Sequence, residues 1–217
     1  MILEEAAHDT NQPVRMTPLT GPIAWTRDSL LPDDGIVKID DACRRELDEV
    51  VATLRANQLP TALLRPDDFS MERCRAMMRK ASHLLTQGPG FVIVDHLPME
   101  QWSRAEATAV YWLLAQMVSR PVAQSWDGKM IYDVRDLGKP PGNGVRPDVT
   151  NAEQNFHTDN SYNICPPDYV ALLCLQSAKE GGVSKHREFL YCIQPDDRAS
   201  SASACAPLQA VLVRPSA

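Results

Sequence analysis

A His-x-Asp triplet, His157-Thr158-Asp159, is the part of this sequence whose residue types could do chemistry. In an extended strand the side chains of residues i and i+2 project from the same face, so we expect His157 and Asp159 to lie side by side. An imidazole and a carboxylate on one face are two of the three ligands in the 2-His-1-carboxylate site that holds non-haem Fe(II). The alternative is a surface turn in which Asp159 accepts a hydrogen bond from a backbone amide.

The composition is typical of a soluble globular protein, with 217 residues, 44% hydrophobic and 23% charged. A formal net charge of −6 argues against nucleic acid or an anionic membrane as a partner. The acidic start, residues 1–5, lacks the basic and apolar segments of a signal peptide, and no apolar run is long enough to span a membrane. We therefore expect a cytoplasmic protein, in which the six scattered cysteines are reduced thiols.

Hydrophobic periodicity predicts three helices ahead of the triplet. Leu47, Val50, Val51 and Leu54 recur at helical spacing, which predicts a helix over residues 41–57 with Asp40 or Asp41 as its cap. A second helix is expected over 70–87, ended by Gly88, and a third from Pro98 to about residue 119. Before them, residues 1–35 form an arm that is either loosely ordered or anchored through Trp25.

Short apolar runs predict strands over residues 91–94, 130–134 and 169–175, the first and the last of them buried. Helices followed by strands favour an α+β domain with a β-rich catalytic half. We divide the chain into the arm (1–35), one domain (36–185) and an atypical tail (186–217).

The residues around the triplet make it specific. Phe156 to Tyr162, then Pro166-Pro167, then Gly181-Gly182-Val183-Ser184, resemble the TauD/TfdA (taurine dioxygenase-like) family of Fe(II)- and 2-oxoglutarate-dependent oxygenases. In that family the His-x-Asp supplies two iron ligands, and a Ser or Thr behind a Gly-Gly turn helps to hold 2-oxoglutarate. Here His157 and Ser184 are 27 residues apart (184 − 157), which fits the family interval.

The resemblance implies a fold and a set of functional residues. The fold would be a partial double-stranded β-helix, a cupin-like jelly roll, with the N-terminal helices packed on it. His157 and Asp159 would bind Fe(II), and Ser184 would contact the cosubstrate 2-oxoglutarate. The expected wall of the substrate pocket, where ordinary strand and turn residues are the alternative, consists of Gln154, Asn160 and Tyr162.

The implied function is a dioxygenase that hydroxylates a small organic molecule with O2, although the sequence selects neither the substrate nor the oligomeric state. Two alternatives remain. One is a non-catalytic remnant or interaction module of the same fold. The other is a cupin-like binder of a sugar or small acid that uses another divalent metal.

One part of the family pattern is missing. The family has a second His roughly a hundred residues or more after the first, and then an Arg for the distal 2-oxoglutarate carboxylate. This chain has 60 residues after His157 (217 − 157), and His186 is its only later histidine. Residues 195–207 also show neither strand alternation nor an amphipathic stripe. We therefore interpret the chain as C-terminally truncated, with residues 186–217 either disordered or read out of frame.

Overall fold

The computed structural model describes residues 20–125, 127–142, 144–154, 157, 159 and 167–177, together with the backbone of 209–215. Three α-helices are present in this part, α1 (Asp41–Ala56), α2 (Glu72–Gln87) and α3 (Arg104–Gln116). Four strands form one sheet in the order β1-β2-β4-β3, with bounds Ile36–Lys38, Phe91–Leu97, Gln209–Pro215 and Tyr169–Leu173. Short 3-10 turns are η1 (Thr61–Leu63), η2 (Pro66–Asp68), η3 (Met99–Gln101) and η4 (Pro147–Val149).

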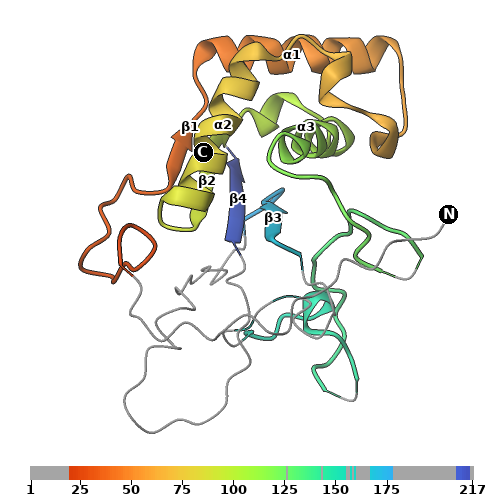
Figure 1. Ribbon diagram of the computed structural model, residues 1–217. Helices are drawn as coiled ribbons and strands as arrows, with labels where there is room; N and C mark the ends of the chain where they lie inside the picture. Colours follow the sequence, from red (N-terminus) through yellow and green to blue (C-terminus); the bar gives the residue numbers. More distant parts are fainter. Residues whose placement is uncertain are drawn as a thin grey trace, which may run out of the picture.

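The helices gather at one end of the structure, beside the sheet (Figure 1). Helix α2 packs on β1 and β2, α3 packs on β3, and α1 lies across both helices. Leu47 of α1, Met78 of α2 and Leu113 of α3 are fully buried where these elements meet. The core of the described part is therefore formed by the helices and by the central residues of β2.

Helices α1 and α2 confirm the sequence predictions. Asp40 is the N-cap of α1, and its Oδ1 accepts a hydrogen bond of 2.8 Å from the backbone amide of Cys43. Gly88 ends α2 and donates its backbone amide to the Leu84 carbonyl at 3.1 Å. The apolar stripes of both helices face the core, since their buried residues recur every three or four positions.

The N-terminus of α2 is capped from α1. Met71, the N-cap residue, makes no side-chain capping hydrogen bond. The Glu46 carboxylate instead accepts hydrogen bonds from the backbone amides of Arg73 and Cys74, both at 2.9 Å. A negative charge at a helix N-terminus also interacts favourably with the helix dipole. This contact fixes the start of α2 against α1.

Helix α3 begins later than predicted. Pro98 precedes the 3-10 turn η3, and the α-helix starts after Ser103. Ser103 and Glu106 form a capping box, in which Ser103 Oγ accepts the Glu106 amide and the Glu106 carboxylate accepts the Ser103 amide. The Ser-x-x-Glu pattern was the stronger start signal, because it satisfies two free amides at once.

The arm residue Trp25 is anchored, as one of the two sequence interpretations expected. Its indole Nε1 donates a hydrogen bond of 2.8 Å to the Pro89 carbonyl. Its ring meets Phe91 of β2 edge-on at a centroid distance of 5.6 Å. These contacts hold the chain before β1 against the start of β2.

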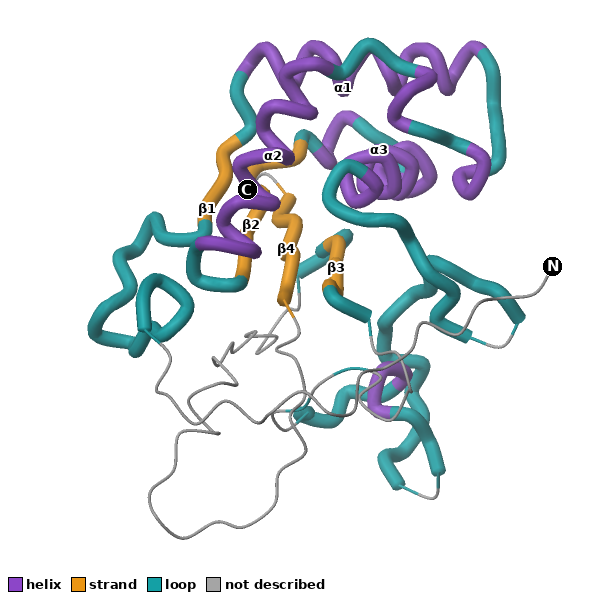
Figure 2. The backbone as a smooth tube through the Cα atoms, viewed as in Figure 1, coloured by secondary structure: helices purple, strands orange, loops and turns teal. Residues whose placement is uncertain are grey.

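The strands, orange in Figure 2, lie side by side. Within the described sheet they pair only in parallel. Ile36 is in register with Ile93, Val92 with Val211, and Ala171 with Val211 on the other side of β4. A jelly roll is built from antiparallel pairs, and none occurs among these four strands. The jelly roll therefore stays a prediction from the family resemblance.

Two strand predictions need correction. Residues 130–134 form no strand, and the backbone amides just after them, at Arg135 and Leu137, donate to the carbonyls of Asp148 and Val149. Strand β3 is present but only partly buried, with Leu172 48% exposed. Strand β4 lies within the predicted tail, 186–217, and the division of the chain into arm, domain and tail stays a prediction.

The described cysteines Cys43, Cys74 and Cys174 are free thiols, as predicted. Burial raises the pKa of Cys43 to about 11 and raises the pKa of Cys74 as well. These two thiols are therefore protonated packing groups between α1 and α2. No helix in the described ranges is both long and apolar enough to cross a membrane.

Candidate metal site

The structure brings His157 and Asp159 together. The Nε2 atom of His157 and the Oδ1 atom of Asp159 are 3.4 Å apart, and the two side chains are 51% and 48% exposed. The sequence predicted that these two side chains lie side by side, but it predicted a strand as the reason. His157 lies in irregular chain and Asp159 in a turn, so no regular strand aligns them.

The pair is chemically suited to a metal ion. Two ligand atoms that share one ion lie about 3 to 3.5 Å apart, because each metal–ligand bond is about 2.1 Å long. Imidazole nitrogen together with carboxylate oxygen suits Fe(II) and similar divalent metals. Both side chains are about half exposed to solvent.

A third ligand is not found in the described part of the chain, where no group of three His, Cys, Asp or Glu side chains could hold a metal. Gln154, a predicted pocket residue, is described and exposed. The other predicted residues, Asn160, Tyr162 and Ser184, lie outside the described residues. Among the described residues, the candidate metal site therefore consists of one imidazole–carboxylate pair.

Polar contacts organise the loop that leads to this pair. Arg146 forms an ion pair with Asp148 at 3.0 Å and lies over the Tyr132 ring at 5.6 Å from its centroid. These residues line a hollow of about 250 Å³, and Arg104 of α3 forms an ion pair with Asp133 beside it. No sequence signal indicated these pairings.

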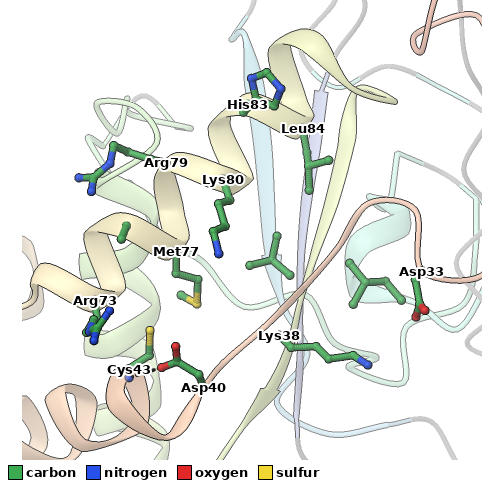
Figure 3. Close-up of a pocket in the computed structure, with 13 residues that line it drawn as sticks. Asp33, Lys38, Asp40, Cys43, Arg73, Met77, Arg79, Lys80, His83 and Leu84 are labelled. Carbon is green, nitrogen blue, oxygen red and sulfur yellow. Dashed lines mark hydrogen bonds between the residues drawn. The ribbon is translucent and has the colours of Figure 1, made fainter.

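A larger groove lies beside β1 and was not foreseen either. It has a volume of about 920 Å³ and is lined by β1, the chain on either side of that strand, and α2 (Figure 3). It contains none of the predicted site residues. The sequence signal that could have revealed it is the run of basic residues on the exposed side of α2.

A comparison with known protein families identifies the class of protein. Residues 58–185 match the model of the Taurine catabolism dioxygenase TauD, TfdA family. This match covers more than half of the chain and includes the His157–Asp159 pair, so the chain belongs to this family. Its members are dioxygenases that depend on Fe(II) and 2-oxoglutarate.

The chain is also similar to a curated enzyme of this family. The chain is 27% identical over 168 residues to the FR-33289 synthase of Streptomyces rubellomurinus (strain ATCC 31215). The match covers 76% of this chain and 48% of the relative. This chain therefore spans about half the length of the curated relative that it matches.

Proposed function

We propose that this chain carries part of the active site of an Fe(II)- and 2-oxoglutarate-dependent dioxygenase that hydroxylates a small organic molecule. The observation that carries the proposal is the 3.4 Å approach of His157 and Asp159 within the residues that match the family. In this proposal both side chains are iron ligands, and the protein adopts the cupin-like jelly roll in the cytoplasm.

Each member of the pair has its own part. His157 would bind the ion through the lone pair of a ring nitrogen. Asp159 supplies a negative charge that offsets part of the charge of the ion. Bound Fe(II) would supply the activation of O2, with 2-oxoglutarate as the co-reductant.

The remaining predicted residues would serve the cosubstrate and the substrate. Ser184 is proposed to donate a hydrogen bond to 2-oxoglutarate. Gln154, Asn160 and Tyr162 are proposed to line the substrate pocket, where amide and hydroxyl groups would orient a polar small molecule.

Anaerobic titration of the chain with Fe(II) and 2-oxoglutarate tests the proposal. The chelate should give a weak visible charge-transfer band, and H157A and D159A should each abolish it. D168A is the matched control, because Asp168 is an exposed carboxylate nine residues after Asp159 (168 − 159). A band that persists in both ligand variants would overturn the residue assignment. No band at saturating iron would favour the non-catalytic alternative.

A further inference from the structure

The groove between β1 and α2 carries more positive charge than the protein as a whole. Four basic side chains line it, from Lys38, Arg73, Arg79 and Lys80, against two acidic ones, Asp33 and Asp40. The whole chain has a formal net charge of −6. The groove is therefore a local basic site on an acidic protein, and it favours an anionic ligand.

The basic groups are available for a ligand. None of the four forms an ion pair with a carboxylate in the part of the chain that the structure describes. The Asp40 carboxylate, in contrast, is occupied as the cap of α1, and the Cys43 amide that it accepts lowers its pKa. Asp40 also interacts electrostatically with Arg73, so it offsets part of the positive charge at that end of the groove.

The arrangement of the basic groups indicates the shape of the ligand. Figure 3 shows Lys80 over the middle of the groove, with Arg73 toward one end and Lys38 toward the other. Arg73 and Lys80 start about 10 Å apart along the axis of α2. Charges that are spread in this way suit an extended ligand with several anionic groups, whereas a single small anion would need them to converge on one point.

The wall of the groove suits a peptide. Its lining includes the half-buried apolar side chains of Ile36 and Leu84, which can pack against apolar side chains of a peptide. Strand β1 is the edge of the described sheet and pairs only with β2 there. On its outer side the Ile36 amide donates to the Asp33 carbonyl, so an added strand would pair with the later part of this edge. In an extended peptide every second side chain lies on one face, about 7 Å apart. Acidic residues at that spacing can meet the long basic side chains along the groove.

We propose that this groove binds an extended acidic segment of a partner protein, which lies alongside β1 under the basic side of α2. This binding function goes beyond the proposed oxygenase chemistry. It is separate from it, because no predicted iron-site residue lines the groove.

Fluorescence anisotropy with the full chain tests the proposal. The probe is a labelled Val-Glu-Val-Glu-Val-Glu peptide, and its Gln counterpart supplies the uncharged comparison. The Glu peptide should bind, more weakly as the salt concentration rises, and the Gln peptide should bind at least tenfold more weakly. The double variant R73E/K80E should weaken binding of the Glu peptide at least tenfold. Both side chains are exposed, so circular dichroism should show an intact fold.

The matched control is R44E/R45E, which makes the same charge change on α1 outside the groove. Equal weakening by this control would show nonspecific attraction and overturn the proposal, as would equal binding of the Gln peptide. Complete displacement of the peptide by millimolar inorganic phosphate would assign the groove to small anions instead. A dimer that R73E/K80E dissociates would show that a second copy of the chain occupies it, which also contradicts the proposal.

Discussion

The cap that Glu46 provides for α2 leads to a sharp prediction about stability. Glu46→Ala removes both hydrogen bonds to the amides of Arg73 and Cys74, and no side chain at Met71 replaces them. Loss of a helix cap costs about 1 kcal/mol. The lost charge at the helix N-terminus adds roughly 0.3–1 kcal/mol. We therefore expect the free energy of unfolding to fall by about 1.3–2 kcal/mol.

Urea unfolding followed by circular dichroism at 222 nm measures this change. For a chain of this size, about 2 kcal/mol corresponds to a fall in Tm of roughly 4–8 °C. Glu46→Gln keeps one acceptor oxygen without the charge, so it should lose about half as much. Glu49→Ala is the control, since Glu49 is an exposed carboxylate on the same helix with no side-chain contact to α2. If E46A and E49A differ by less than about 0.5 kcal/mol, the tertiary cap does not stabilise α2.

Two further predictions follow from the fold. The Arg55 guanidinium and the Ser103 amide lower the pKa of Glu106 to about 2, so this carboxylate stabilises the fold above its unfolded pKa near 4.5. That contribution should disappear as the pH falls from about 4.5 toward 2, and E106Q should flatten the dependence of unfolding free energy on pH over this window. Gly35 has φ +75°, and an added Cβ would lie 2.5 Å from the Phe91 ring. Gly35→Ala should therefore lower the unfolding free energy in a urea titration by more than Gly138→Ala, where φ is +68° and the space is open. Equal losses would mean that only the backbone conformation matters.

Much of the helical layer could be predicted from sequence, because each helix carries local signals. The cap at Asp40, the stop at Gly88 and the apolar stripes all act over a few residues. The start of α3 was misplaced because Pro98, which favours the first turn of an α-helix, is instead the residue before the 3-10 turn η3. The parallel sheet was not foreseen, since it joins β2 to strands far along the chain, and pairing over such distances leaves no local pattern.

The candidate site was predicted as a pair and not as a complete centre. The spacing of His157 and Asp159 places them together in the structure, although a turn and not a strand aligns them. The local adjacency follows from a separation of two residues, which keeps the side chains close in several backbone conformations. A third ligand would come from a distant part of the sequence, and neither composition nor periodicity indicates which residue that would be. The basic groove escaped prediction for a similar reason, because it requires β1 and α2 to pack together.

Anaerobic equilibrium dialysis against Fe(II) tests the central claim, that His157 and Asp159 hold iron, most directly, and it requires no turnover. The chain should retain iron, and the double variant H157A/D159A should lower the affinity at least tenfold. The control D168A should bind iron as the unmodified chain does. Unchanged iron binding by H157A/D159A would contradict the claim.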